Sequence, residues 1–350
     1  MQDPKKKMPY LPDPKLQDAV EMAISMEIPL FVTGEPGTGK TELAYWIAQH
    51  EPFLKQYGLG GEVLRFNVKT TSTAKDLLYR YDAIRHFRES HRLQHETGGA
   101  QKNLNILQFI QFEALGQAII AARSQRRVVL IDEIDKAPRD FPNDLLFEFE
   151  KLAFRIEEAT TPELHDAKFD WPAMPSLRDL GIDKPVFNEQ DFILYADKAE
   201  IKEKKVRKPV LILTSNSEKN LPDAFLRRCA FYHIPFPEDH KDLQRILEIK
   251  GLYDEKKNAA LLASALDFFL DLRKNAGLRR KPATAELIVW VEFLLESKLD
   301  PHKPLEQSDV PALLASLSML GKNREDLDRI RQQLETKRKN PPASAGIQLE

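Results

Sequence analysis

The chain has 350 residues, of which 42% are hydrophobic, and this length suits about two domains with substantial cores. Its 52 lysines and arginines nearly balance its 54 aspartates and glutamates, which argues against a nucleic-acid-binding protein. The single cysteine, Cys229, excludes an intramolecular disulfide and a cysteine-based zinc site, as expected in a reducing compartment. No apolar run reaches membrane-spanning length and the first residues lack a signal-peptide core, so a cytoplasmic protein is expected.

The first part of the chain leads into a glycine-rich loop. Residues 1–14 are rich in proline and charge and are expected to be extended, before a helix over 15–26. An apolar run from Pro29 then enters the pattern Gly-x-x-x-x-Gly-Lys-Thr at Gly34–Thr41, and apolar residues recur after it at helical spacing. Strand, loop and helix in this order predict a phosphate-binding loop, because glycines let consecutive backbone N–H groups converge on an anion.

The side chains of this loop indicate what it binds. Lys40 would reach the β- and γ-phosphates and the hydroxyl of Thr41 would bind Mg²⁺, so ATP and Mg²⁺ are the expected cofactors. The alternative is a glycine-rich turn that merely resembles the motif, and the flanking strand and helix argue against it. The residues expected to bind nucleotide here are Gly34, Glu35, Pro36, Gly37, Thr38, Gly39, Lys40, Thr41 and Glu42.

The segment after this loop is expected to alternate strands and helices. Glu62–Val68 alternates apolar and polar residues, which predicts a strand, and a helix is expected over 74–87. Residues 90–103 are mostly polar and contain a glycine pair, so we expect a mobile surface loop. A further helix is expected over 108–123.

A second strand ends in two carboxylates. Val128–Ile131 is too apolar to alternate, which predicts a strand buried on both faces of a parallel sheet, and Asp132 and Glu133 follow it directly. In the Walker B pattern the first carboxylate orients the magnesium shell and the second polarises the attacking water. We therefore expect Asp132 to serve as a metal ligand and Glu133 as general base. The alternative is a strand that stops at a solvated acidic turn.

A third apolar strand adds another candidate. Before it, a helix is expected over 141–151, a short strand over 154–156, an insertion of unassigned role over 158–190, and a hairpin flanked by 192–195 and 202–208. Val210–Leu213 is again uniformly apolar, and Asn216 follows it. Functional side chains gather at the carboxyl ends of parallel strands, so we expect Asn216 to hold the attacking water. The alternative is an ordinary polar turn after a strand.

Two adjacent arginines follow this strand. Pro222 is placed to open a short helix that ends at Arg227 and Arg228, before a strand around His233. Two cations at a helix C-terminus can complement the helix dipole. The alternative interpretation delivers an arginine to the γ-phosphate held by a neighbouring subunit.

The last third of the chain shows helical patterns only. They cover about 243–249, 259–272, 285–295, 312–320 and 324–337. We therefore expect an extended segment at 1–14, a nucleotide-binding domain at 15–237, a helical lid at 238–338 and a disordered tail at 339–350.

These motifs, in this order and followed by a helical lid, resemble the AAA+ ATPases over nearly the whole chain. The motifs that carry the resemblance are Gly34–Thr41, Val128–Asp135, Thr214–Asn216 and Arg227–Cys229. Within that superfamily, Pro29–Thr41, 131–138 and 280–287 are similar to the MoxR family, near the branch associated with von Willebrand A proteins. The implied fold class is α/β: a P-loop NTPase with a three-layer αβα parallel sheet, followed by an all-helical lid.

The resemblance implies a ring, commonly a hexamer, with ATP held between neighbouring subunits. Asn216 matches the sensor 1 position, and Arg228 matches the arginine finger, with Arg227 in an assisting role. Sensor 2 should lie at the start of the helix opened by Pro282, where Arg279, Arg280 and Lys281 are all candidates and Arg280 is favoured. Two further assignments each have a structural alternative. Asn67 matches the position of a residue that restrains the catalytic glutamate in related ATPases, or is a polar strand end. Tyr10 and Leu11 contact adenine, or take part in ordinary core packing.

The main hypothesis is an Mg²⁺-dependent ATPase whose ring remodels a partner protein, one with a von Willebrand A domain. A nucleic-acid-directed motor is the first alternative, and the near-neutral charge argues against it. The second alternative is a nucleotide-gated scaffold with little turnover, and the presence of Glu133 argues against it because such a switch needs no general base. The expected partners are further copies of the chain and the von Willebrand A protein, with neither a membrane span nor nucleic acid.

Overall fold

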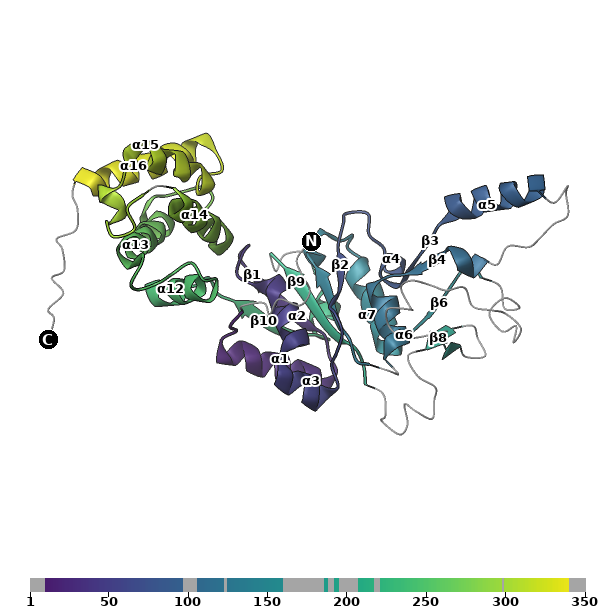
Figure 1. Ribbon diagram of the computed structural model, residues 1–350. Helices are drawn as coiled ribbons and strands as arrows, with labels where there is room; N and C mark the ends of the chain where they lie inside the picture. Colours follow the sequence, from purple (N-terminus) through teal and green to yellow (C-terminus); the bar gives the residue numbers. More distant parts are fainter. Residues whose placement is uncertain are drawn as a thin grey trace. The chain divides into compact units, whose positions relative to one another are not determined.

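The computed structural model describes residues 10–96, 106–122, 125–159, 186–187, 192–194, 207–216, 221–297 and 299–339. The described chain falls into two compact units (Figure 1). The first, here the sheet unit, comprises the described residues up to Thr33 and Lys40–His233. The second, the helical unit, comprises Gly34–Gly39 and the described residues from Ile234 onward.

A parallel sheet organises the sheet unit. Its five strands lie in the order β10-β1-β9-β5-β2, and the pairings of β1 with β9, β9 with β5 and β5 with β2 are parallel. In register, Leu130 lies opposite Ile212 and Asn67 opposite Asp132. The strands are β1 (Leu30–Gly34), β2 (Leu64–Asn67), β5 (Val128–Asp132), β9 (Val210–Ser215) and β10 (Ala230–Ile234). Because carboxyl ends of parallel strands share one edge, the motifs that follow β5 and β9 are neighbours.

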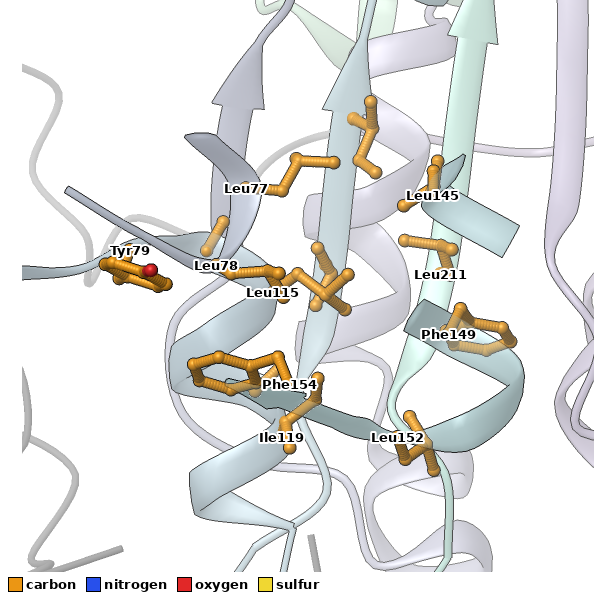
Figure 2. Close-up of a cluster of buried hydrophobic side chains, with 14 of the residues drawn as sticks. Leu77, Leu78, Tyr79, Leu115, Ile119, Leu145, Phe149, Leu152, Phe154 and Leu211 are labelled. Carbon is orange, nitrogen blue, oxygen red and sulfur yellow. The ribbon is translucent and has the colours of Figure 1, made fainter. Parts of the chain in front are cut away.

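Helices cover both faces of this sheet. Every residue of β5 and β9 is buried, as the uniformly apolar runs predict. Phe31, Ile131 and Leu213 pack in one core with α6 (Ala114–Ala121) and α7 (Phe141–Lys151), part of which is drawn in Figure 2. The intervening strand residues face the opposite side, where α2 packs against β5 and β9. In Figure 1, α1, α2 and α3 accordingly lie on one side of the sheet and α6 and α7 on the other.

The first helix of the chain begins at a capping residue that the sequence provides. The first, α1, runs over Pro14–Met26, and the Asp13 carboxylate accepts the Leu16 N–H at 3.0 Å. Proline occupies its first position, where no backbone donor is needed. The next helices are α2 (Lys40–Gln49) and α3 (Glu51–Tyr57), and α11 (Asp223–Leu226) follows Pro222, which is its N-cap. The predicted helix over 15–26 is confirmed.

The region between β2 and β5 differs from expectation. The predicted helix over 74–87 is wrong, since α4 (Lys75–Leu78) ends at a strand, β3 (Tyr79–Tyr81), and α5 (Ala83–Glu96) follows. The predicted helix over 108–123 is also wrong at its start, because η1 (Ile106–Phe109) leads into β4 (Ile110–Phe112).

The physical reason is pairing between distant short segments. Tyr79–Tyr81 and Ile110–Phe112 form an antiparallel ribbon with Tyr79 opposite Phe112, and both rings are buried. The loop expected over 90–103 is helical through Glu96, and 97–103 lie outside the described residues. None of the described side chains of α5 is buried, and Ile84 and Phe87 are each 66% exposed.

A second small sheet joins segments around the predicted insertion. β8 (Phe192–Leu194) pairs antiparallel with both β6 (Ala153–Arg155) and β7 (Val186–Phe187). Most of the insertion over 158–190 and residues 202–206 lie outside the described residues.

The helical unit has its own core. It contains α12 (His240–Ile249), α13 (Ala259–Asn275), α14 (Thr284–Glu296), α15 (Val310–Ser316) and α16 (Arg324–Lys339), with η3 (Leu305–Gln307) and η4 (Leu317–Met319). Leu262, Phe269, Trp290 and Ile330 are fully buried in one cluster. The Trp290 indole donates to Ser316 Oγ at 2.9 Å, which satisfies its only polar atom. The helical patterns predicted for this region are confirmed. Of the predicted tail, Lys339 ends α16, and 340–350 lie outside the described residues.

The architecture agrees with the predicted fold class, a parallel sheet with flanking helices followed by a helical region. In the described part of the chain, no helix combines the length and apolar character that crossing a bilayer requires.

Candidate active site

The glycine-rich loop between β1 and α2 requires positive φ. Gly37 and Gly39 have φ values of 80° and 88°, which L side chains rarely adopt. A Cβ on Gly37 would also lie 2.8 Å from the backbone nitrogen of Ala285, within the helical unit. Thr38 closes the loop, since its N–H and hydroxyl both donate to the Glu35 carbonyl, at 3.3 and 2.9 Å. The loop therefore has the backbone form that the motif predicts for anion binding.

Lys40 and Thr41 open helix α2. The Lys40 side chain is buried, and burial lowers its pKa, an effect that the Asp132 carboxylate partly offsets. The Thr41 hydroxyl lies 3.2 and 3.3 Å from the two Asp132 carboxylate oxygens. This places two hard oxygen ligands side by side, which is the donor type that Mg²⁺ prefers.

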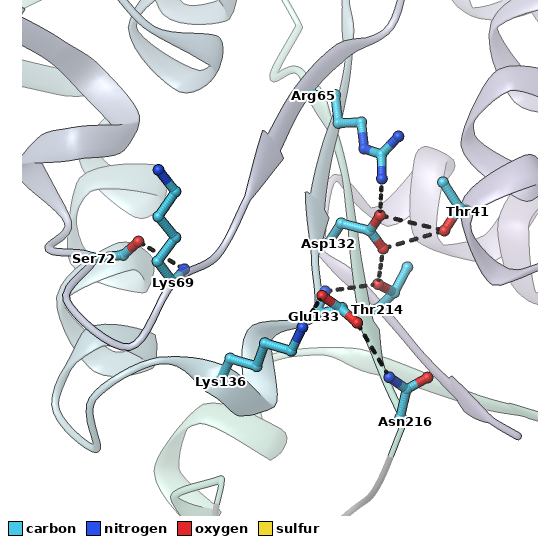
Figure 3. A network of polar contacts seen from close by, with 9 residues as sticks. All are labelled: Thr41, Arg65, Lys69, Ser72, Asp132, Glu133, Lys136, Thr214 and Asn216. Atoms are coloured by element: carbon cyan, nitrogen blue, oxygen red, sulfur yellow. Dashed lines mark hydrogen bonds and ion pairs between the residues drawn. The ribbon is translucent and has the colours of Figure 1, made fainter. Parts of the chain in front are cut away.

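Asp132, the last residue of β5, is the centre of a polar network (Figure 3). Its carboxylate is almost buried and accepts from the Thr214 hydroxyl at 2.5 Å and from Arg65 at 2.6 Å. Together with Thr41, these donors hold the carboxylate in one orientation. Arg65 and Thr214 were not among the predicted site residues. The signal for Thr214 in the sequence is a polar residue that directly extends a uniformly apolar strand.

Glu133 has an unusual backbone. Its φ and ψ are 61° and 51°, a left-handed conformation that costs a residue with a Cβ roughly 1–2 kcal/mol. The Glu133 N–H donates to the Thr214 hydroxyl at 3.0 Å. Thr214 thus links the two consecutive carboxylate residues and holds the turn that separates their side chains.

The Glu133 carboxylate is held on both oxygens. Asn216 Nδ2 lies 3.4 Å from one oxygen, and Lys136 Nζ donates to the other in a short ion pair. This hydrogen bond raises the pKa of the Lys136 ammonium, which is therefore charged at neutral pH. The structure thus brings the predicted base and the predicted sensor 1 residue together. Lys136 was not among the predicted site residues.

The other candidates in the sheet unit lie outside this network. Asn67 is exposed and pairs in register with Asp132, and in the described part of the chain no hydrogen bond joins it to Glu133. Arg228 pairs with Glu150 at 3.4 Å, each about half exposed, and Arg227 is also exposed. Tyr10 is half-buried, and this burial raises its pKa, whereas Leu11 is 48% exposed.

Within the helical unit, two arginines are placed by one carboxylate. The fully buried Asp326 accepts the backbone N–H groups of Arg279 at 2.8 Å and Arg280 at 3.1 Å. The two side chains stay on the surface, 70% and 63% exposed. Asp326 therefore fixes the backbone from which the predicted sensor 2 residue projects.

A third arginine of this unit was not predicted. Arg273 is buried and donates to the Glu35 carboxylate of the glycine-rich loop at 2.7 Å and to the Pro282 carbonyl at 2.5 Å. Its guanidinium also lies over the Phe236 ring, 3.3 Å from the centroid. The residues that the pair joins are 238 positions apart, so nothing local in the sequence signals it.

No curated protein matches the chain. Among solved structures, a RuvB variant of Thermotoga maritima is 12% identical, with a TM-score of 0.40 over 92% of this chain and 67% of that chain. NtrX from Brucella abortus in complex with ATP is 14% identical, with a TM-score of 0.42 over 95% of this chain, which spans only 61% of the NtrX chain.

A family model gives a more specific result. The model for the AAA domain of the dynein-related subfamily matches residues 29–229, which is more than half of the chain. This match includes the glycine-rich loop, the two carboxylates at the end of β5, Asn216 and the Arg227-Arg228 pair. The chain therefore belongs to the AAA domain family, in its dynein-related subfamily.

Proposed function

We propose that this protein is an Mg²⁺-dependent ATPase of the MoxR type that acts as a ring, commonly a hexamer, and remodels a partner protein in the cytoplasm. The observation that carries the proposal is the hydrogen-bond network at the carboxyl ends of β5 and β9. There the candidate metal ligands and the candidate base converge: Thr41, Asp132, Thr214, Glu133 and Asn216 (Figure 3).

The nucleotide would be held through its phosphates. The backbone N–H groups of Gly34–Thr41 would point the positive ends of their dipoles at the phosphates. The buried Lys40 ammonium would add one full positive charge. Because burial lowers the pKa of Lys40, a bound anion stabilises its charged form and the protein gains binding energy from the pair. Tyr10 and Leu11 remain the proposed adenine contacts, and Glu42 and Arg280 complete the proposed nucleotide-binding set.

Hydrolysis would use the two carboxylates in different roles. Thr41 and Asp132 would hold Mg²⁺, which supplies charge to stabilise the phosphoryl group during transfer. Glu133 would accept the proton of the attacking water, and Asn216 would hold that water in place. The network favours this division of labour, because Asp132 is buried and fixed by three side chains, whereas the Glu133 side chain is 39% exposed.

The ring is proposed because Arg228 lies on the surface of the protomer. An arginine that reaches the phosphate of a neighbouring subunit must be exposed in its own, and Arg228 is 51% exposed. A finger of this kind contributes on the order of 10³–10⁵ in rate in related phosphoryl-transfer systems. Arg227, next to it on the surface, is the proposed assisting residue.

The partner is proposed from the MoxR resemblance. The runs that carry it, Pro29–Thr41, 131–138 and 280–287, include the loop, the carboxylate pair and the turn fixed by Asp326. A protein with a von Willebrand A domain is the proposed partner. The test is whether a purified domain of this kind changes the rate of ATP hydrolysis and co-elutes with the ATP-bound protein.

The central experiment measures Mg²⁺-dependent phosphate release from ATP. Glu133→Gln should lower turnover by on the order of 10²–10⁴ while ATP still binds. Glu51→Gln is the matched control, since Glu51 is an exposed glutamate on α3 that pairs with Lys55. Native mass measurement with and without ATP tests the ring. Absence of hydrolysis in the wild type, or equal turnover in Glu133→Gln and Glu51→Gln, would overturn the proposed chemistry.

A further inference from the structure

The one-turn helix after Glu133 brings a lysine back over the proposed base. η2 covers Ile134–Lys136, and Lys136 N–H donates to the Glu133 carbonyl at 3.0 Å. This hydrogen bond brings Lys136 back to Glu133, which precedes the helix in a left-handed conformation. The geometry of the turn therefore places the Lys136 ammonium against the Glu133 carboxylate.

The backbone of this turn is fixed from a second side. Glu133 is held in its left-handed conformation by the hydrogen bond from its N–H to the buried Thr214 hydroxyl. Rotation of the Glu133 side chain is thus the freedom that remains for the carboxylate. In the described structure two contacts restrict this rotation. Lys136 donates to one carboxylate oxygen, and Asn216 Nδ2 lies 3.4 Å from the other.

A carboxylate paired in this way is a poor general base. To take a proton it must present a free lone pair within about 2.6–3.2 Å of the water. A charge-assisted hydrogen bond from an ammonium fixes the direction in which the carboxylate points, so its lone pairs reach such a water only after the side chain turns away from Lys136. The pair is also about half exposed, 50% for Lys136 and 39% for Glu133, so solvent weakens it and lets it open reversibly.

We propose that Lys136 is the residue that restrains Glu133, and that hydrolysis requires this pair to open. The inference rests on the proposed function, in which Glu133 is the base. Lys136 is a positioning residue, because it acts through Glu133 and not on the substrate. Asn67, the sequence-based candidate for this role, is exposed and makes no hydrogen bond to Glu133 in the described part of the chain.

The kinetic test uses variants at Lys136 and at a matched lysine. Lys303 pairs with Asp300 in the same i, i+3 arrangement and with similar exposure, 58% and 46%. Lys136→Met should raise basal kcat about tenfold, which corresponds to about 1.4 kcal/mol of barrier, with KM and ATP affinity unchanged. Lys136→Arg, which keeps the charge, and Lys303→Met should both resemble the wild type. Unchanged or lower kcat in a folded Lys136→Met protein would overturn the inference.

The second test does not need turnover. An amine paired with a carboxylate reacts slowly with acetic anhydride, and the acetylation rate at each lysine can be followed by mass spectrometry. Lys136 should react several-fold faster in Glu133→Gln than in the nucleotide-free wild type, whereas Lys303 should react equally in both. A non-hydrolysable ATP analogue with Mg²⁺ should raise the Lys136 rate in the wild type.

The two tests separate the possible failures. Equal labelling of Lys136 in the wild type and in Glu133→Gln shows that the pair does not form, whatever the enzyme does. Slow labelling together with no hydrolysis in either the wild type or Lys136→Met shows that the pair exists but the proposed function is wrong. Slow labelling with hydrolysis that Lys136→Met fails to raise rejects the restraint alone.

Discussion

The guanidinium of Arg65, on β2, lies 2.6 Å from a carboxylate oxygen of Asp132 at the end of β5. Asn67 is opposite Asp132 in register, so Arg65 stands two residues earlier on the same strand face. The Asp132 side chain is 8% exposed and that of Arg65 is 41% exposed. Arg65 therefore neutralises the carboxylate assigned to Mg²⁺ in the proposed function, and a bound Mg²⁺ would have to compete with it.

This competition predicts that Arg65 weakens the response to Mg²⁺. Arg65→Gln should lower the Mg²⁺ concentration for half-maximal binding of a fluorescent ATP analogue by about threefold to tenfold, because one charge-assisted hydrogen bond no longer has to be displaced. The measurement is a Mg²⁺ titration at constant ionic strength. Arg92→Gln is the control, since Arg92 pairs with Glu89 on exposed α5. A higher Mg²⁺ requirement in Arg65→Gln would contradict the prediction.

Thr214 should be needed for turnover more than for nucleotide binding. Thr214→Val keeps the shape of the buried side chain but removes the hydroxyl that donates to Asp132 and accepts from the Glu133 N–H. We expect a loss of about 1–3 kcal/mol in unfolding free energy, the range for a buried group left without its partner. ATP hydrolysis should fall by more than tenfold. Thr214→Ser restores the hydroxyl and should recover most of the rate, and a fully active Thr214→Val would exclude this role.

Arg228 and Arg227 can be separated by single substitutions. Arg228→Ala should reduce ATP hydrolysis by on the order of 10³ while ATP affinity stays within about twofold, and Arg227→Ala should have the smaller effect. The reason is that a finger acts on the transition state in the neighbouring subunit. Mixing Arg228→Ala with Glu133→Gln protein tests this directly, since mixed rings contain some junctions with an intact base and an intact finger.

Recovery of activity in that mixture is the expected outcome. Mixtures that stay inactive, or an Arg228→Ala protein that hydrolyses ATP at the wild-type rate, would remove Arg228 from the mechanism.

Glu150→Gln is a useful companion variant, because Glu150 pairs with Arg228 at 3.4 Å in the protomer. Both side chains are about half exposed, so loss of this pair should change unfolding free energy by less than about 1 kcal/mol.

Much of the site could be predicted because its signals are local. The apolar runs before Asp132 and Thr214 identify buried parallel strands, and the edge at which those strands end follows from their parallel pairing. The glycine spacing of Gly34–Thr41 required positive φ, which Gly37 and Gly39 adopt. Consequently the sequence alone was enough to infer that Asp132, Thr41 and Glu133 lie close together.

The features that could not be predicted depend on contacts between residues far apart in the sequence, or on a backbone conformation that the sequence does not reveal. Tyr79–Tyr81 shows strand periodicity over only three residues, and its partner Ile110–Phe112 lies some thirty positions later, so helical spacing over 74–87 dominated the interpretation. The Lys136 contact with Glu133 depends on the left-handed conformation of Glu133, which residue type does not indicate. Arg273 is buried by contacts from Phe236, Pro282 and Glu35, none of them its neighbour in sequence.

Arg273 should contribute to the stability of the helical unit. It is buried, its guanidinium satisfies the Pro282 carbonyl at 2.5 Å and the Glu35 carboxylate at 2.7 Å, and it covers the Phe236 ring. Arg273→Met keeps the aliphatic stem but leaves the carbonyl and the carboxylate without this donor. We expect a loss of about 2–4 kcal/mol in unfolding free energy, within the range for breaking one side of a buried charged contact.

Glu35→Gln tests the other side of this pair. Glu35 is 46% exposed, so solvent screens its charge, and the Arg273 guanidinium keeps its bond to Pro282; we therefore expect a loss of only about 1 kcal/mol. Urea unfolding, monitored by hydrogen exchange in peptides from α13 and α14, reports on this unit specifically. Arg331→Met is the control, because Arg331 is 48% exposed and pairs only with Asp328 three positions before it among the described contacts. If Arg273→Met and Arg331→Met unfold at the same urea concentration, the buried contacts of Arg273 contribute nothing to the stability of the helical unit.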